Sequence, residues 1–264
     1  MTAVPVLLST SSYYPQRTEA AFACAQRLGY DGVEVMVWQW PETQSARALN
    51  DLSQRFQLPV GAVHSPTLLL TQRVWGSDPW AKIDRSIELA EAVGAPTVVV
   101  HPPFRWQTRY AAEFVEGIAT RQRGTDVHVT VENMFPWKAR AREDSRSRER
   151  NVYLPHWDPV GQDYEHITLD LSHTAIAGQD ALEVARELGR RLAHIHLTDS
   201  TGTNRDEHLV PGRGNQRCAE VLGELPALGF TGSVAVEVTT RKMAPEEREE
   251  ALAEALAFAR RHLP

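Results

Sequence analysis

Short apolar runs of strand length alternate with longer amphipathic stretches along nearly the whole chain. Each run is five or six residues long and rich in Val, Ile or Leu, and eight of them are predicted strands. They are Val4–Ser9, Gly32–Val37, Val60–His64, Thr97–His101, Val127–Glu132, His166–Leu171, Ala193–Leu197 and Ser233–Val238. Such an alternation is typical of parallel βα units.

The stretches between these strands have helical periodicity, and Gly29, Gly94 and Gly229 follow three of them as residues that can close a helix. The predicted helices are Thr18–Leu28, Thr43–Phe56, Pro79–Val93, Arg109–Arg121, Leu182–Arg191, Gln216–Leu228 and Pro245–His262. The segment after the fifth strand has no clear helical pattern. An open doubly wound sheet usually carries a Gly-rich phosphate-binding loop after an early strand, and this chain has none. We therefore predict one α/β domain over residues 1–264, a closed (β/α)8 barrel of the TIM type.

The composition agrees with one enzyme-sized globular domain. The chain has 264 residues, of which 42% are hydrophobic and 23% charged. It has no apolar run of membrane-spanning length and no basic, apolar leader at its start, so we expect a cytoplasmic protein without membrane contact. Cys24 and Cys218 lie far apart in predicted helices, which argues against a disulfide framework or a zinc site built on cysteine.

The net charge of −6 provides no general positive field for a polyanion, so duplex nucleic acid is not the first candidate partner. One segment is locally basic, although acidic residues partly offset its charge. Its cations are Lys138, Arg140, Arg142, Arg146, Arg148 and Arg150.

Imidazole and carboxylate side chains occur where the predicted strands end. In a barrel of this type the carboxyl ends of the strands converge on one mouth, where the chemistry is found. The strand-end residues and those in the loop after the seventh strand are His64, His101, Glu132, Asp170, His173, His196, Asp206, His208 and Glu237. So many ionisable groups at one apolar mouth would repel and be poorly solvated without a cation. The set therefore predicts a divalent metal site of the kind preferred by zinc or manganese, with Glu132, Asp170, His196 and Glu237 as its firmest ligands.

The order of these motifs resembles the xylose-isomerase-like barrel superfamily over essentially the whole chain. This superfamily includes sugar and sugar-phosphate isomerases and epimerases, and the endonuclease IV family of apurinic endonucleases. The motifs are His64-Ser65, His101-Pro102, Glu132-Asn133, Asp170-Leu171-Ser172-His173, His194-Ile195-His196, Asp206-Glu207-His208 followed by Pro211-Gly212-Arg213-Gly214, and Glu237-Val238.

The resemblance implies two competing functions. In the isomerases and epimerases one metal would be held by Glu132, Asp170, His196 and Glu237, and the two glutamates, the catalytic residues, would also move a carbon-bound proton. In the endonuclease IV relatives the same positions belong to a three-metal phosphoesterase centre. Its further ligands would be His64, His101, His173, Asp206 and His208, all present here. The expected cofactor is thus one to three divalent ions.

We favour the isomerase or epimerase, with a small sugar-like substrate that carries a phosphate or lacks one. The loop after His64 contains Leu68 and Leu69, either of which can wedge into a duplex, but no aromatic residue at the place where the resemblance leads us to expect a stacking tyrosine. The overall acidity also argues against DNA without excluding it. The oligomeric state stays open.

Further substrate contacts are predicted around the mouth. Trp38 and Trp40 follow the second strand, where they can form an aromatic wall or merely pack the loops. Glu34 lies within that strand and can bind substrate or pair with a neighbour. Arg213 is a candidate phosphate ligand in the loop after the seventh strand. The segment Met134–Trp157 is a candidate lid, and its arginines can clamp an anion or simply face solvent.

Overall fold

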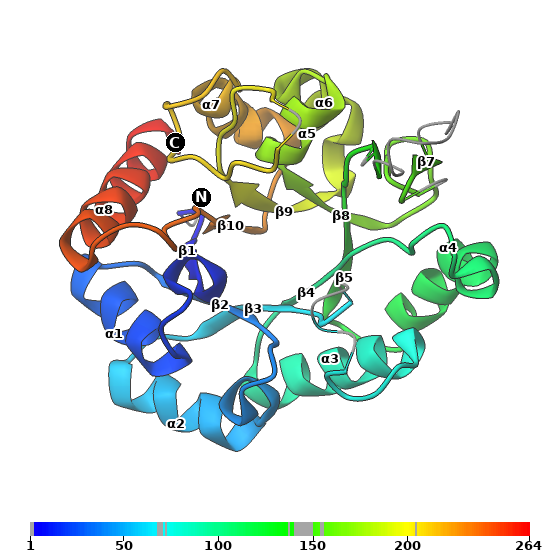
Figure 1. The fold of residues 1–264 in the computed structure, drawn as a ribbon, viewed down its shortest axis with the longest axis horizontal. Helices are drawn as coiled ribbons and strands as arrows, with labels where there is room; N and C mark the ends of the chain where they lie inside the picture. The colour runs from blue at the N-terminus through cyan, green and yellow to red at the C-terminus, as the bar shows by residue number, and fades with distance from the viewer. Residues whose placement is uncertain are drawn as a thin grey trace, which may run out of the picture.

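Eight parallel strands close into a barrel in the computed structural model, which confirms the predicted fold class (Figure 1). The described residues are 3–67, 71, 73–136, 138–139, 150–153, 156–203 and 205–264. Around the barrel the strands follow the order β1, β10, β9, β8, β5, β4, β3 and β2. Their bounds are β1 Val6–Ser9, β2 Gly32–Met36, β3 Val60–His64, β4 Thr97–Val100, β5 His128–Glu132, β8 His166–Asp170, β9 Leu192–Leu197 and β10 Ser233–Val236. Most are a residue or two shorter than predicted.

The helices form a ring outside the barrel (Figure 1). They are α1 Thr18–Leu28, α2 Ala46–Phe56, α3 Pro79–Val93, α4 Thr108–Gln122, α5 Leu171–Ala177, α6 Ala181–Leu188, α7 Cys218–Leu228 and α8 Pro245–His262. Gly29, Gly94 and Gly229 close α1, α3 and α7 with φ values of 86°, 74° and 70°. The left-handed conformation at these positions favours glycine, which is why they mark the helix ends in the sequence.

The regular repeat breaks between β5 and β8. The described residues there contain no helix, and a short antiparallel hairpin of β6 (Lys138–Ala139) and β7 (Arg150–Asn151) is present instead. Two helices, α5 and α6, follow β8, of which the sequence predicts only the second. The predicted helix Leu182–Arg191 ends earlier than expected, because Leu188 is followed by a 3-10 turn, Gly189–Arg191.

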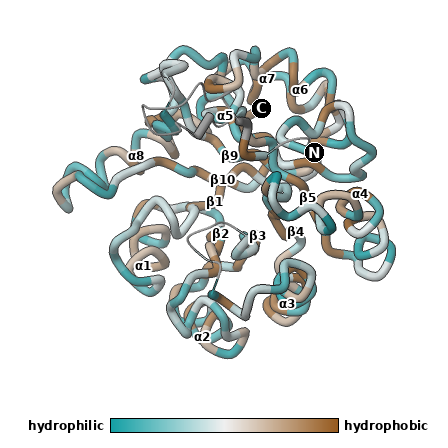
Figure 2. Tube along the Cα trace, turned by 45° about the vertical axis from the view of Figure 1, so that its right-hand side comes forward, coloured by the Kyte–Doolittle hydropathy of each residue, from teal (hydrophilic) through white to brown (hydrophobic). Residues whose placement is uncertain are grey.

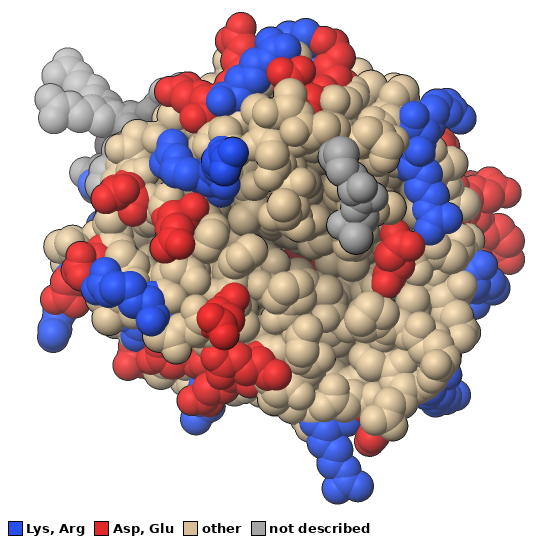
Figure 3. Space-filling view, turned by 180° about the vertical axis from the view of Figure 1, so that it is seen from behind, with Lys and Arg blue, Asp and Glu red and all other residues tan. Residues whose placement is uncertain are grey.

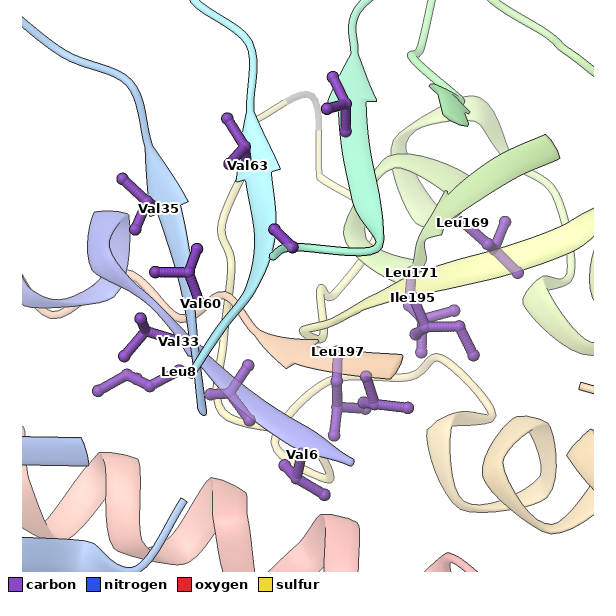
Figure 4. Packing of buried hydrophobic residues seen from close by; sticks show 14 of the residues in the cluster. Val6, Leu8, Val33, Val35, Val60, Val63, Leu169, Leu171, Ile195 and Leu197 are labelled. Carbon is purple, nitrogen blue, oxygen red and sulfur yellow. The ribbon is translucent and has the colours of Figure 1, made fainter. Parts of the chain in front are cut away.

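Alternating positions along each strand divide the core into two parts. Outward-facing Val, Ile and Leu side chains of the strands belong to the main core, in which they pack with the helices (Figure 4). Leu7, Ala62 and Ala235 form a separate buried group inside the barrel. Figure 2 shows the same division as hydrophobic strands at the centre and helices of mixed hydropathy around them.

The inward-facing positions nearer the mouth are polar. Thr130 of β5 and Thr168 of β8 join their hydroxyls at 2.6 Å. Glu34 of β2 reaches His194 of β9 at 2.9 Å, although these strands are not neighbours, so the bond crosses the barrel interior. Because side chains alternate in direction along each strand, these polar side chains all point into the barrel, and they lie close to the carboxyl ends of the strands.

Among the described residues, no helix combines the length and apolar character needed to cross a membrane. Cys24 and Cys218 are both buried and unpaired, as the sequence predicts.

Candidate metal centre and active site

All nine side chains predicted as ligands meet at the carboxyl ends of the strands. Glu132 lies at their centre and is 2% exposed. Its Oε2 is 2.9 Å from Nε2 of His101 and 3.3 Å from Nε2 of His64. Its Oε1 is 3.3 Å from Nδ1 of both His173 and His196. One carboxylate therefore presents each of its oxygens to a different pair of imidazoles.

Asp170 and Glu237 approach the same nitrogen of His196 as Glu132 does. Nδ1 of His196 is 2.9 Å from Oε2 of Glu237 and 3.7 Å from Oδ2 of Asp170. Oδ1 of Asp170 caps α5 by accepting the backbone N–H of His173 at 2.8 Å, while its buried Oδ2 has no hydrogen-bond partner. The other oxygen of Glu237 accepts a hydrogen bond from the Ser11 hydroxyl at 3.0 Å.

His173, Asp206 and His208 form the third part of the cluster. The Asp206 carboxylate lies 3.4 Å from Nε2 of His173 and 2.9 Å from Nε2 of His208. His208 has a φ of 44°, a left-handed conformation that is uncommon for a residue with a side chain and often marks a functional position.

The loop that carries Asp206 and His208 is organised by Asp199. The Asp199 carboxylate accepts four backbone N–H groups, from Ser200, Gly212, Gly214 and Gln216, at 2.8 to 3.0 Å. A Cβ at Gly214 would lie 2.3 Å from Oδ1 of Asp199, so only glycine allows this approach. Asp199 is not among the residues predicted from the sequence, because its role depends on a loop conformation that no local sequence pattern indicates.

Most of the imidazoles are held as metal-binding histidines usually are, with one ring nitrogen bonded to an acceptor and the other facing the centre. Nδ1 of His64, His173 and His208 donates to the backbone carbonyls of Ser65, Asn133 and Glu237 at 3.3, 2.8 and 2.9 Å. Nε2 of His196 donates to Glu34 at 3.2 Å, which leaves Nδ1 toward the carboxylates. These bonds orient the rings with a nitrogen directed at the cluster.

The donor set fits divalent metal. Within three overlapping groups the possible ligand atoms all lie within 4.8 Å of one another. The groups are His64, His101 and Glu132; Glu132, Asp170 and His196; and Asp170, His173 and His208. Imidazole nitrogens and carboxylate oxygens suit zinc or manganese, and the unpartnered Oδ2 of Asp170 is an acceptor that a cation would satisfy.

The electrostatics of the metal-free cluster show how strongly it favours positive charge. Burial alone would raise the pKa of Glu237, but the charges of His196 and His208 outweigh it and lower that pKa to about 2. Burial would likewise lower the pKa of His173, but Asp170, Asp206 and Glu132 together raise it to about 10. A proton on an imidazole such as His173 thus balances part of the carboxylate charge when no metal is bound.

Glu34, a predicted substrate contact, lies beneath this cluster. It is 0% exposed, and its Oε2 accepts hydrogen bonds from both His194 and His196. Of the two roles that the sequence allowed, the structure therefore supports pairing with a neighbour, because no surface of Glu34 faces the mouth. Its partner His194 was not predicted as a site residue, although the motif His194-Ile195-His196 places both rings on the same side of β9.

Arg213 does not join the cluster either. Its Nε donates to Glu254 of α8 at 3.1 Å, at the outer surface of the barrel. The turn fixed by Asp199 directs it there. Trp38 and Trp40 do lie near the mouth and line a cavity of their own. Leu68, Leu69 and the arginines between residues 140 and 149 lie outside the described residues, as do the side chains of Lys138 and Arg150.

Seven of the nine side chains of the cluster, all except Asp170 and His196, line a cavity of about 450 Å³, which is of a size suited to a small molecule. Met134, Phe135 and Tyr153, from the two ends of the proposed lid, line it as well. Figure 3 shows the side of the molecule opposite to that seen in Figure 1. Around the outside of that face the described Lys and Arg side chains are interspersed with Asp and Glu, without a continuous positive patch.

Comparison with known proteins assigns the family. The model of the xylose isomerase-like TIM barrel family matches residues 22–262. The chain belongs to this family. Among its relatives, the uncharacterized protein Rv0498 of Mycobacterium tuberculosis is 50% identical over 275 residues, which cover 99% of this chain and 98% of that protein.

Sugar epimerases are among the other members that the chain resembles. The fructoselysine 3-epimerase of Shigella flexneri is 22% identical over 247 residues, which cover 85% of this chain and 86% of the enzyme. The structure of D-psicose 3-epimerase from Clostridium cellulolyticum H10, solved with D-tagatose, matches with a TM-score of 0.70 at 17% identity, over 98% of this chain and 99% of that one. At that identity the structural match establishes a shared fold.

Proposed function

We propose that this member of the family is a divalent-metal-dependent isomerase or epimerase of a small sugar-like substrate. The observation that carries the proposal is the placement of Glu132 and Glu237. Both carboxylates contact Nδ1 of His196, at 3.3 and 2.9 Å, and both line the same cavity. Two carboxylates around one binding position are what proton removal and return at a substrate carbon require.

Glu132, Asp170, His196 and Glu237 would hold the ion of such an enzyme. When bound, it supplies a Lewis acid that polarises a substrate carbonyl and stabilises the negative charge developing on its oxygen. One glutamate takes the proton from the carbon next to that carbonyl. Return of a proton to the opposite face by the other glutamate inverts the centre. Return of the proton to the former carbonyl carbon, together with transfer of the hydroxyl proton to the former carbonyl oxygen, gives the isomer. Ser11, which donates to Oε1 of Glu237, holds that carboxylate in position.

Exchange of substrate hydrogen with solvent deuterium tests this function. Metal-loaded protein incubated in D₂O with a panel of ketoses and aldoses, free and phosphorylated, is expected to incorporate deuterium next to the carbonyl of at least one. Glu132→Gln and Glu237→Gln should abolish the exchange while the fold is kept, because both lie above the apolar core. Glu254→Gln, on the surface of α8, is the matched control. No exchange across the panel, or full activity of either site variant, contradicts the proposal.

A multi-metal phosphoesterase is a second candidate, and one specific observation favours it. Glu132 presents one oxygen to Nε2 of His64 and His101 and the other to Nδ1 of His196, an arrangement suited to bridging two ions. Adjacent ions in such centres activate water and stabilise a leaving oxygen. The three overlapping ligand groups would accommodate more than one ion.

The number of ions per chain separates the two candidates. Elemental analysis of protein saturated with manganese or zinc should give one ion for the isomerase, and two or three for the phosphoesterase. His64→Ala, outside the four-ligand set, should reduce turnover only mildly in a one-metal enzyme and severely in a multi-metal enzyme. A count above one, together with cleavage of an abasic-site duplex, would favour the second candidate.

A further inference from the structure

A second cavity adjoins the metal cluster. It encloses about 340 Å³ and is lined by side chains from the loops after β1, β2 and β10, among them Tyr14, Trp38, Trp40 and Arg241. Met36 lines both this cavity and that of the cluster. Ser11 also faces it and donates to Glu237. A ligand bound in this second cavity would therefore lie directly beside the proposed reaction centre.

Three aromatic rings form its walls. Tyr14 stacks with Trp40 at 6.1 Å between ring centroids and 21° between planes, and it meets Trp38 edge-on at 6.1 Å and 61°. All three are only partly buried and line the cavity, so part of each ring is exposed to a ligand there. Aromatic faces of this kind bind flat or ring-shaped groups, including the C–H face of a sugar.

The walls are fixed before any ligand binds. The backbone N–H of Trp38 donates to the Thr43 hydroxyl at 2.9 Å, and the Gln44 side chain donates to the Trp38 carbonyl at 2.8 Å. The Arg17 guanidinium lies 5.4 Å from the Trp40 ring centroid and bonds to Glu42 at 2.7 Å. When the loops of a pocket are already ordered, ligand binding loses little free energy to ordering them.

Arg241 supplies the one cationic group of this cavity. Its guanidinium lies over the Tyr14 ring, 5.2 Å from the centroid, and the side chain is exposed. Among the described residues it has no carboxylate partner, unlike Arg17, which bonds to Glu42. The turn that carries it is fixed by the bond from the Met243 N–H to the Thr240 carbonyl at 2.9 Å. An unpaired guanidinium beside an aromatic wall can bind an oxyanion through two parallel hydrogen bonds.

We propose that this cavity, the aromatic subsite of Tyr14, Trp38, Trp40 and Arg241, binds the part of the substrate remote from the reacting carbon. The group it takes is ring-shaped and carries an oxyanion, a phosphate or a carboxylate, that pairs with Arg241. The assignment of this group to the substrate rests on the proposed function, whereas the binding itself does not. The substrate class is thereby narrowed to anionic sugar derivatives.

Tryptophan fluorescence of the metal-free, full-length protein tests the subsite, because Trp38 and Trp40 report on it directly. Glucose 6-phosphate, glucuronate, glucose and inorganic phosphate are the probes. We expect glucose 6-phosphate or glucuronate to change the emission and to bind more tightly than glucose or inorganic phosphate. Which of the two anionic sugars binds more tightly distinguishes phosphate from carboxylate.

Variants locate the binding site. Arg241→Gln should weaken binding about 10-fold or more, as expected for loss of a charge-assisted bidentate pair. Trp40→Phe should remove much of the fluorescence change. Arg186→Gln, which breaks only the surface pair of Arg186 with Glu224, is the matched control and should bind as the wild type does. Circular dichroism of each variant checks that it is folded.

Several results would overturn the proposal. They are equal binding of glucose and its anionic derivatives, unchanged affinity in Arg241→Gln, no emission change with any anionic probe, and binding that requires added metal, which would place the oxyanion on the ions. Failure of the proposed function would look different. Anionic sugars would then bind in the subsite, but no sugar would exchange hydrogen with solvent.

Discussion

Glu34→Gln tests whether the buried layer beneath the cluster supports metal binding. Glu34 has almost the same shape as glutamine, so the substitution removes a charge without opening a cavity. In the protein its Oε2 accepts hydrogen bonds from Nε2 of His194 at 2.9 Å and from Nε2 of His196 at 3.2 Å. The second bond leaves Nδ1 of His196 facing Glu132 and Glu237.

The magnitude follows from the position of Glu34 behind a ligand. Loss of a carboxylate that orients a metal-binding histidine typically costs 10-fold to 100-fold in metal affinity, or about 1.4 to 2.7 kcal/mol. Burial opposes protonation of His196, but Glu34, Glu237 and Glu132 together raise its pKa well above the ordinary value. Glu34→Gln therefore also lowers the pKa of His196, so that a proton competes less strongly with the metal for that ring. Because a divalent ion carries the larger charge, we expect the net result to be weaker metal binding.

Competition with a calibrated chelator measures the affinity directly. We expect the variant to bind manganese or zinc at least about 10-fold more weakly than the wild type. The buried Oε1 of Glu34 has no partner, so an amide nitrogen there would also cost about 1 to 3 kcal/mol of stability. Thermal unfolding with and without metal separates the two effects, since the metal-induced rise in Tm should shrink as well.

The matched control is Glu254→Gln, which removes a surface carboxylate paired with Arg213. It should leave metal affinity unchanged. Metal affinity of Glu34→Gln within twofold of the wild type would refute the view that Glu34 positions His196 as a ligand.

Three further predictions concern the cluster, the loop held by Asp199 and the apolar core. First, metal affinity should rise with pH up to about 10, the raised pKa of His173 in the metal-free protein, because the proton on that ring opposes binding of an ion in the cluster; calorimetry in buffers of different ionisation enthalpy should detect proton release, and pH-independent affinity would contradict it. Second, Asp199→Asn should lower the free energy of unfolding by at least about 3 kcal/mol in urea titrations, because its amide group cannot accept all four backbone N–H groups; a change below about 1 kcal/mol would contradict the stated role of Asp199. Third, Phe114→Ala should cost about 3 to 5 kcal/mol in the same assay, since Phe114 is 0% exposed and packs against Trp80, Tyr110 and Tyr164; a loss below about 1 kcal/mol would show that the site collapses without a cavity.

The sequence predicts the barrel well because its strands and helices carry strong local patterns. The bounds of α1, α3 and α8 are as predicted, since glycine or proline marks the ends of these helices. Strand ends are equally visible where an apolar run stops at a polar residue, as at His64 and Glu132. For that reason the positions of the predicted ligands could be read along the chain.

Other features depend on contacts between distant segments and could not be predicted. Glu34 precedes the end of β2 by two residues, so its depth below the mouth follows from the register of the closed barrel rather than from its neighbours in the sequence. The direction of Arg213 is set by the turn that Asp199 holds. α5 is only seven residues long, too short for its own periodicity to be recognised, and its N-terminus is capped by Asp170.

An anomalous difference map from crystals of this protein soaked in manganese would show whether the nine convergent side chains form a metal centre. We expect a strong peak between Glu132, Asp170, His196 and Glu237, and any additional peaks beside His64 and His101 or beside His173 and His208 would give the ion count. A map without a peak among these residues would show that they do not bind the metal.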